Sequence, residues 1–321
     1  MKSPIYFLLA IVLLSSSVVQ AQGSRSMRGR TPTNPATAKE LRLYSKKLTQ
    51  VPADITKYKK LESLDLGKNL LQDLPQYITQ LKNLKSLKLY DNKFSTFPKV
   101  LTQIPTLGDL SLEKNQLQTL PEEIGELKNL TSLSVENNQL KDLPKSVEKL
   151  QKLYRVYLGY NQFTKIPKSV MKLTGLVHLY LFYNQIDEIP QNIEVLKNLR
   201  FLHLGYNKLE SVPNNIAKLK NLTWLDLGAN KLKTFPTGVI KLTNLTDLYL
   251  GGNQLTTLPE DFTHLTKLIY LDLSGNQIKT LPRNIGRLKN LKRLTLRETP
   301  ISPQEVRRIQ QLLPQCKIIL K

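Results

Sequence analysis

The chain has 321 residues, a formal net charge of +22 and a single cysteine. One cysteine excludes an intramolecular disulfide, so stability has to come from a buried apolar core. The positive charge predicts attraction to polyanions such as nucleic acid, acidic glycans or lipid headgroups, although lysines spread over an outer surface for solubility give the same total. We favour solubility, because lysine recurs at one place of the repeat described below, at Lys82, Lys128, Lys197, Lys220 and Lys289.

Residues 1–21 have the features of a secretory signal peptide. Lys2 supplies the charge, an apolar run extends from Ile5 to Val19, and the small-residue cleavage site ends at Ala21. The run is short for a membrane span. We therefore predict an exported protein of the periplasm, the cell surface or the medium. Residues 22–37 are polar and basic without core periodicity, which predicts a flexible leader.

From residue 61 to residue 301, one pattern returns every 23 residues without insertion or deletion. In one unit it consists of Leu107, Leu110, Leu112, Asn115, Leu117, Leu120 and Pro121. A fixed period with L-x-x-L-x-L-x-x-N-x-L indicates a solenoid, in which each unit packs only against its neighbours. About twelve units fit within residues 38–301, and we expect them to form one domain.

The hydrophobic period changes within each unit. The alternation in residues 64–66 predicts a short strand with leucines inward, and successive strands should pair in parallel. The asparagine, such as Asn69, stands where backbone groups of adjacent turns need a buried partner. The spacing of Pro121, Ile124 and Leu127 predicts a short helical turn on the opposite side. The fold class is therefore α/β.

The two ends of the repeat differ. Residues 302–305, Ser-Pro-Gln-Glu, form a capping-box pattern with proline at the first helical position. It predicts a helix whose apolar stripe is Val306, Ile309, Leu312 and Leu313. With a strand at residues 316–320, and Cys316 as a buried thiol, residues 302–321 should form a C-terminal cap. The N-terminal strand at residues 41–43 has no comparable lid and is expected to be an exposed edge.

This pattern resembles the 23-residue repeats of bacterial leucine-rich-repeat proteins, whose units read L-x-x-L-x-L-x-x-N-x-L-x-x-L-P-x-x-I-x-x-L. The chain is similar to exported repeat proteins of spirochaetes such as Leptospira and of Bacteroidetes, over about residues 38–321. The resemblance implies a leucine-rich-repeat solenoid, or horseshoe. It has a parallel sheet on the concave side, short helical or 3₁₀ turns on the convex side and a C-terminal helix cap. It implies binding of other molecules, but no particular ligand.

The outward strand positions change character along the chain. Units two to five present small and charged groups, whereas aromatic side chains dominate from unit six. The candidate partner-binding residues are Arg155, Tyr157, Tyr160, His178, Tyr180, Phe182, Tyr183, Phe201, His203, Tyr206, Trp224, Asp226, Asp247, Tyr249, Tyr270 and Asp272. An exposed aromatic patch usually marks an interaction site. The alternative is that the rings stack on one another and stiffen the sheet.

Two further features accompany the aromatic residues. Tyr160, Tyr183 and Tyr206 are 23 residues apart, which predicts a ladder on adjacent units. Four glycines beside them are expected to leave room for a ligand: Gly159, Gly205, Gly228 and Gly251.

Other chemistry finds little support in the sequence. His178, His203 and Asp226 suggest a metal site, but the histidines occupy different rows and no H-E-x-x-H spacing exists, so we predict no metal. No P-loop, G-x-S-x-G or dinucleotide motif is present, so we predict no enzyme activity and no cofactor. The Asn-Leu-Thr sequons at residues 129, 221 and 244 follow from the repeat and are interpreted as accidental.

The sequence therefore favours an exported, non-enzymatic binding protein that takes a protein or peptide on the aromatic concave surface of units six to nine. One alternative is a carbohydrate or cell-envelope glycan, with rings stacked on sugars and Asp226 or Asp247 accepting hydroxyl protons. Another is adhesion to polyanions through the basic convex ridge. Ridge binding should weaken steeply with ionic strength, whereas binding through the rings should not.

Overall fold

The structure is a computed structural model that describes residues 34–320. These residues form one parallel sheet of thirteen strands, hydrogen-bonded in chain order. The predicted signal peptide and most of the leader lie outside the described residues. The strands are β1 (Glu40–Arg42), β2 (Ser63–Asp65), β3 (Ser86–Lys88), β4 (Asp109–Ser111), β5 (Ser132–Ser134), β6 (Arg155–Tyr157), β7 (His178–Tyr180), β8 (Phe201–His203), β9 (Trp224–Asp226), β10 (Asp247–Tyr249), β11 (Tyr270–Asp272), β12 (Arg293–Thr295) and β13 (Lys317–Ile319).

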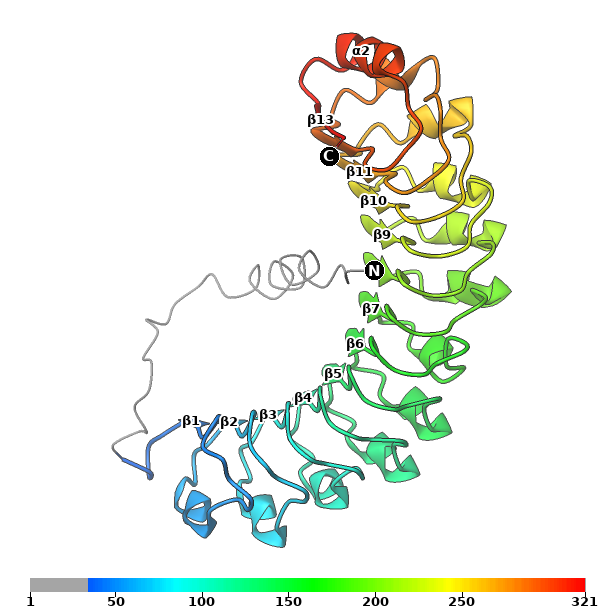
Figure 1. Ribbon diagram of the computed structural model, residues 1–321. Helices are drawn as coiled ribbons and strands as arrows, with labels where there is room; N and C mark the ends of the chain where they lie inside the picture. Colours follow the sequence, from blue (N-terminus) through cyan, green and yellow to red (C-terminus); the bar gives the residue numbers. More distant parts are fainter. Residues whose placement is uncertain (1–33, 321) are drawn as a thin grey trace. The chain divides into compact units, whose positions relative to one another are not determined.

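Short 3₁₀ helices follow the strands on the opposite side of each turn. Eleven of them lie within residues 34–320: η1 (Ala53–Lys57), η2 (Gln76–Gln80), η3 (Lys99–Gln103), η4 (Glu122–Glu126), η5 (Lys145–Lys149), η6 (Val170–Lys172), η7 (Gln191–Val195), η8 (Asn214–Lys218), η9 (Thr237–Lys241), η10 (Glu260–His264) and η11 (Ile285–Arg287). In the repeat stack the strands line the inner curve and these helices the outer one (Figure 1). Pro121 directly precedes η4, as the sequence predicts. The solenoid fold class is thus confirmed.

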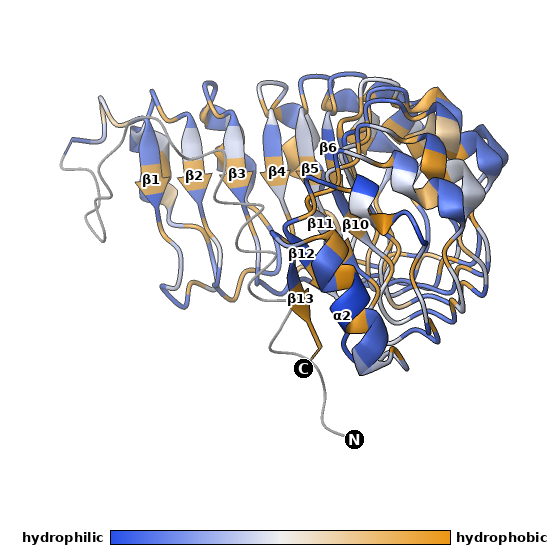
Figure 2. Cartoon of the chain, turned by 90° about the horizontal axis from the view of Figure 1, so that it is seen from above, coloured by the Kyte–Doolittle hydropathy of each residue, from blue (hydrophilic) through white to orange (hydrophobic). Residues whose placement is uncertain are grey.

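The strand register repeats the sequence period. Strands β1 to β12 pair at an offset of 23 residues, so that Leu110 lies opposite Leu133. The middle residue of each of these strands is buried, and its two neighbours point to the concave face. Figure 2 shows the apolar middle residue of β1, β2 and β3 in orange, between ends that are pale or blue. The register therefore places equivalent outward side chains of successive units side by side.

The repeated asparagines bridge neighbouring turns, as predicted. Asn115 Nδ2 donates to the carbonyl oxygens of Leu89 and Leu112, both at 3.0 Å. Its Oδ1 accepts from the backbone N–H of Phe94 at 3.1 Å. The side chain is buried and satisfies backbone groups that water cannot reach. The same bonds recur in every unit from Asn69 to Asn276.

The C-terminal cap consists of helix α2 (Pro303–Leu312) and strand β13. Ser302 Oγ accepts from Glu305 N at 3.1 Å, so half of the predicted capping box is present. The other half is wrong, because the Glu305 carboxylate turns away from the Ser302 backbone. It accepts instead from Leu281 N at 2.9 Å and from Arg308 Nη2 at 2.6 Å. The carboxylate thereby attaches the helix to the preceding unit.

The predicted apolar stripe of α2 is only partly buried. Ile309 and Leu313 are buried, but Leu312 is 41% exposed, so its place in the buried stripe is wrong. Leu313 follows the helix, and its burial there turns Leu312 outward. Cys316 is buried as predicted, and burial raises the pKa of its thiol to about 11. No helix within residues 34–320 has the length and apolar character needed to cross a bilayer.

Candidate partner-binding surface

The sixteen candidate residues lie on the concave side of units six to eleven, in three rows and one additional position. The first row is formed by the first strand residues: Arg155, His178, Phe201, Trp224, Asp247 and Tyr270. The second row is formed by the third strand residues: Tyr157, Tyr180, His203, Asp226, Tyr249 and Asp272. The third row, which we call the tyrosine ladder, is Tyr160, Tyr183 and Tyr206, and Phe182 stands between the second row and the ladder. The strand register brings all of them together.

Rings at equivalent positions stack. In the tyrosine ladder the centroids of Tyr160 and Tyr183 are 4.4 Å apart and those of Tyr183 and Tyr206 are 4.0 Å apart, with interplanar angles of 9° and 10°. In the first row His178 stacks on Phe201 at 4.4 Å. These separations are close to the strand spacing of about 4.8 Å, so the sheet itself sets the stacking distance. The proposed stiffening contacts are therefore present, and the outer faces and edges of several rings remain open.

The prediction that all these rings project into solvent is wrong for three of them. Tyr180, Phe182 and His203 are only 9%, 3% and 7% exposed. Phe182 stacks on His203 at 4.4 Å and meets the edge of Tyr160 at 5.2 Å. These side chains form an aromatic layer above the backbone, and Tyr160, which contacts it, is exposed, as is Tyr270 on β11. The remaining candidate residues are half-buried.

The glycines beside the rings do not leave the expected space. A Cβ atom at Gly159 would lie 2.6 Å from the Phe182 ring, because that ring fills the position. At Gly205 and Gly251 the space is taken by the carboxylates of the next unit, Asp226 and Asp272. The predicted ligand space is therefore wrong at these positions. Each glycine instead accepts a side chain from the neighbouring strand.

The tyrosine ladder has an unusual backbone conformation. Tyr160, Tyr183 and Tyr206 have φ angles of 52°, 51° and 56°, in the left-handed region. Other units hold Ser, Lys, Asp, Asn, Ala, Gly or Glu at this place, also with positive φ. The repeat backbone thus imposes the conformation, and a bulky side chain there costs roughly 1–2 kcal/mol relative to glycine. None of the three tyrosines belongs to the hydrophobic core.

The acidic candidates are mostly engaged within the protein. Asp226 Oδ1 accepts from Gly228 N at 2.7 Å, and Asp272 Oδ1 accepts from the N–H and the hydroxyl of Ser274. His203 Nε2 lies 2.8 Å from Asp226 Oδ2, but the contact is not aligned as a hydrogen bond. Within residues 34–320 no group of three or more His, Cys, Asp or Glu residues is arranged to hold a metal ion.

The charge state of the aromatic region follows from its burial. Burial lowers the pKa of His178 to about 4, and repulsion from Arg155 and Arg200 contributes to the decrease. Burial also raises the pKa of Tyr183, with a further contribution from its hydrogen bond to Tyr206. At neutral pH the His178 and Tyr183 side chains are therefore uncharged.

Two glutamates beside the aromatic region were not among the predicted site residues. Glu113 and Glu136 directly follow the buried residue after β4 and β5, at a place where five units have glycine. Burial raises the pKa of Glu136 to about 8, and the charge of Glu113 adds to the rise. The sequence contained a signal for this pair, namely two consecutive units with glutamate where glycine recurs.

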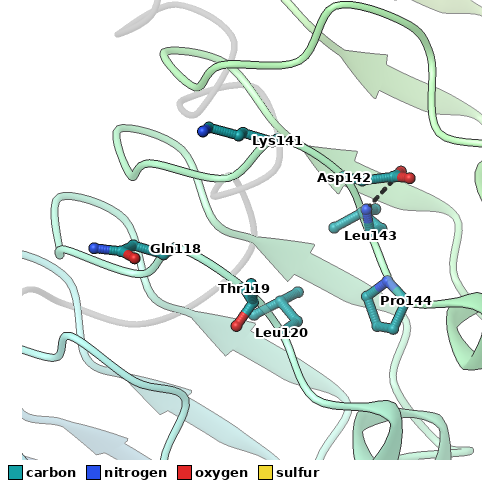
Figure 3. A pocket seen from close by; sticks show the side chains of 7 residues that line it. All are labelled: Gln118, Thr119, Leu120, Lys141, Asp142, Leu143 and Pro144. Atoms are coloured by element: carbon teal, nitrogen blue, oxygen red, sulfur yellow. Dashed lines mark hydrogen bonds between the residues drawn. The ribbon is translucent and has the colours of Figure 1, made fainter.

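A shallow hollow of about 320 Å³ lies away from this surface (Figure 3). It is formed by the chain segments that precede η4 and η5 and is lined by Gln118, Thr119, Leu120, Lys141, Asp142, Leu143 and Pro144. Asp142 Oδ1 accepts from Leu143 N at 2.8 Å, so its polar group is occupied. The hollow is a gap between successive units and contains none of the candidate residues.

The chain matches two models of repeated sequences. The model described as leucine rich repeat matches residues 59–117, 184–232, 196–255, 220–278 and 243–301. The model described as leucine-rich repeat region matches residues 99–199. No curated protein matches the chain.

Solved structures resemble the chain over most of its length. A leucine-rich-repeat protein of Leptospira interrogans is 32% identical, with a TM-score of 0.67 over 89% of this chain and 96% of that one. The internalin InlF of Listeria monocytogenes is 23% identical, with a TM-score of 0.78 over 89% and 81%. The ectodomain of the Arabidopsis thaliana receptor kinase GASSHO1/SCHENGEN3, solved in complex with CASPARIAN STRIP INTEGRITY FACTOR 2, is 26% identical. It has a TM-score of 0.66 over 88% of this chain and 41% of that one.

Proposed function

Because the chain belongs to the leucine-rich-repeat family, whose fold commonly serves as a non-enzymatic scaffold for protein–protein interactions, we propose that it is an exported binding protein. It takes a protein or peptide partner on the aromatic concave surface of units six to nine. Export rests on the signal-like pattern of residues 1–21.

The observation that carries this proposal is the tyrosine ladder. Its three residues occupy a left-handed backbone position that disfavours bulky side chains, and they lie outside the hydrophobic core. Tyr160 remains 41% exposed at one end of the stack. Stacking between the rings offsets part of the conformational cost, which only glycine, as at Gly252 and Gly275, would avoid. Retaining three such rings fits a role in contact with another molecule.

The physical properties of the surface suit a protein interface. Tyr and Trp provide large contact area with few rotatable bonds, and they dominate interface hot spots. Here the rings are already held by stacking, so little side-chain freedom remains to be lost on binding. Trp224 continues the layer through a 5.1 Å edge contact with His203. The internal hydrogen bonds of Asp226 and Asp272 leave those carboxylates less free to hold sugar hydroxyls.

A relative also supports a proteinaceous partner. The plant receptor ectodomain, at 26% identity, was solved in complex with CASPARIAN STRIP INTEGRITY FACTOR 2. This chain spans 41% of that ectodomain, so the comparison supports the kind of interaction rather than its specificity.

The test is affinity capture with the full chain from the envelope and culture medium of the source cells. A captured protein is then purified, and its Kd is measured by calorimetry. We expect the triple variant Tyr160→Ala, Tyr183→Ala and Tyr206→Ala to weaken binding by about 100-fold, since hot-spot truncations cost about 2 kcal/mol or more.

The matched control changes the same backbone position in the polar units. The variant Lys68→Ala, Asp91→Ala and Lys114→Ala also replaces three residues with positive φ. It should leave the Kd within about twofold, because these side chains lie outside the aromatic surface. Equal affinity of wild type, ladder variant and control would reject the aromatic surface as the binding site.

A further inference from the structure

Two arginines lie at the edge of the aromatic surface, in units six and eight. The residues that directly precede the strands form a row along this edge, which we call the rim. Arg200 is the rim residue before β8, and Tyr154 is the one before β6. Arg155 follows Tyr154, and its guanidinium carbon lies 4.6 Å from the centroid of the Tyr154 ring. The two cations therefore stand at the rim on either side of unit seven.

The protein itself supplies no counter-charge at this place. Within residues 34–320 neither Arg155 nor Arg200 forms an ion pair with a carboxylate. By contrast, Arg42 and Arg308 each pair with a glutamate of their own segment. From β5 to β9, neither the rim residue nor the first strand residue is acidic in any unit. An acidic group for these two cations would therefore have to come from another molecule.

The first units show what fits between two cations on the rim. Lys39, Glu62 and Lys85 are the rim residues before β1, β2 and β3. Glu62 Oε1 lies 2.8 Å from Lys39 Nζ, and Glu62 Oε2 lies 2.7 Å from Lys85 Nζ. Hydrogen bonds from Lys39 and Lys85 lower the pKa of Glu62 to about 2. One carboxylate can thus bind two cations that are two units apart on the rim.

Val177 occupies the rim between the two arginines, at the place that Glu62 has between the lysines. The Val177 N–H donates to Tyr154 O at 3.0 Å, and Val177 O accepts from Arg200 N at 2.9 Å. The Glu62 backbone makes the same two bonds to its neighbouring units, both at 2.8 Å. The backbone geometry is therefore equivalent at the two places. Unpaired basic side chains occur elsewhere in this chain, but here two of them flank a position that is acidic in unit two.

Uncharged rings adjoin this place on the concave side. His178 follows Val177 in the chain and stacks on Phe201 at 4.4 Å. Both arginines are close enough for their charges to contribute to the lowered pKa of His178, whose main cause is burial. A carboxylate over Val177 would therefore meet two cations at the rim, while the residues beside it lie on the rings of the aromatic surface.

We propose that Arg155 and Arg200 together bind an aspartate or glutamate side chain of the partner, whose carboxylate lies over Val177. This inference rests on the proposed function and adds the chemistry of the partner. The carboxylate forms charge-assisted hydrogen bonds with both guanidinium groups, as Glu62 does with two ammonium groups. An acidic partner also suits the net charge of +22, which attracts it from a distance.

The test is a random-peptide phage library selected against the full chain, with the displayed peptides fused at their carboxyl ends. We expect the selected peptides to have an aspartate or glutamate at one position, next to apolar or aromatic residues. In a synthetic selected peptide with an amidated end, replacing that residue by asparagine or glutamine should weaken binding by about tenfold. The double variant Arg155→Gln and Arg200→Gln should lose the same factor, and against it the peptide replacement should have no further effect.

Two further variants test the place itself and the role of the net charge. Val177→Glu puts a carboxylate where unit two has one, so it should occupy both arginines and weaken peptide binding by about tenfold. Val177→Gln is its uncharged control and should stay within about threefold of wild type. The variant Arg283→Gln and Arg287→Gln removes two exposed positive charges at η11 on the convex side, and should bind like wild type.

The outcomes separate this inference from the proposed function. Selected peptides that need the tyrosine ladder but show no acidic position would overturn this inference alone. The same holds if replacing the acidic residue weakens binding equally in wild type and in the Arg155 and Arg200 variant, or if Val177→Glu keeps full affinity. Peptides that bind the ladder variant as well as wild type, or a library that yields no binder, would overturn the proposed function and this inference together.

Discussion

Units two to five and units six to ten have the same backbone but different concave surfaces. The strands pair at the same 23-residue offset in both regions, and their middle residues are equally buried. At the left-handed position the first region has Lys68, Asp91, Lys114 and Asn137, whereas the second begins with the tyrosine ladder and continues with Ala229 and Gly252. The repeat therefore fixes the position of each outward side chain but not which amino acid occupies it. Function is therefore free to change along the solenoid without a change of fold.

The largest expected loss of stability comes from truncating a buried strand leucine, and it should be similar in the two regions. Leu133→Ala in β5 and Leu202→Ala in β8 each empty a fully buried strand centre. We expect each to lower the free energy of unfolding by about 2–5 kcal/mol, since both leave a cavity in the core. Urea unfolding monitored by circular dichroism measures this. A much smaller loss in one region would show that the two cores are not equivalent.

The asparagine bridge should make the next largest contribution to the free energy of unfolding, and it should do so in both regions. Asn115→Ala leaves the carbonyl oxygen of Leu89 and the N–H of Phe94 without their buried partner. In the second region, Asn207→Ala removes the equivalent partner of the Leu181 carbonyl oxygen and of the Ile186 N–H. We expect a loss of about 1–3 kcal/mol in each variant from the unfolding midpoint in urea. Unchanged midpoints would mean that water replaces the amide.

The pH dependence of stability should separate the regions at their border. The folded pKa of Glu136 is raised to about 8, above the ordinary value of 4.5. Between these values the folded chain binds more protons than the unfolded one, so this group lowers stability as pH rises from about 4.5 to 8. Allowing for solvent screening, we expect Glu136→Gln to stabilise the protein by roughly 1–2 kcal/mol at pH 8 and by almost nothing at pH 4.

The check is thermal or urea unfolding of wild type and Glu136→Gln at several pH values. Glu123→Gln, on the outer side, is the comparison variant and should not gain stability as pH rises. A pH-independent difference between wild type and Glu136→Gln would contradict the raised pKa.

The smallest effects should come from the left-handed position itself. Lys114→Gly removes the strain of a side chain at positive φ and loses no ring contact. We therefore expect the free energy of unfolding to rise by about 0.5–1 kcal/mol. Tyr183→Gly relieves the same strain but loses stacking on Tyr160 and Tyr206, so its net change should be near zero or unfavourable. Calorimetric melting of both variants gives the comparison. A gain at Tyr183 as large as that at Lys114 would show that the ring stack contributes nothing to stability.

Most of the fold could be predicted from the sequence because its determinants are local and repeated. The Leu-x-Leu alternation predicted the strands, and the constant spacing of the units predicted the 23-residue register. The asparagines from Asn69 to Asn276 predicted the bridges between turns. The start of α2 at Pro303 also followed from its own residues. The concave-side positions of the candidate residues within strands were predictable for the same reason, since a strand alternates its faces.

Only the tertiary structure determined the contacts and the burial of each outward side chain. Phe182 covers Gly159, the Asp226 carboxylate fills the space at Gly205, and the Glu305 carboxylate reaches Leu281 N rather than its own helix start. Glu113 and Glu136 form a pair only because their strands lie side by side. Such contacts join residues of successive units through their rotamers. A one-dimensional pattern states which face a residue occupies, but only packing against the neighbouring turn determines what covers it.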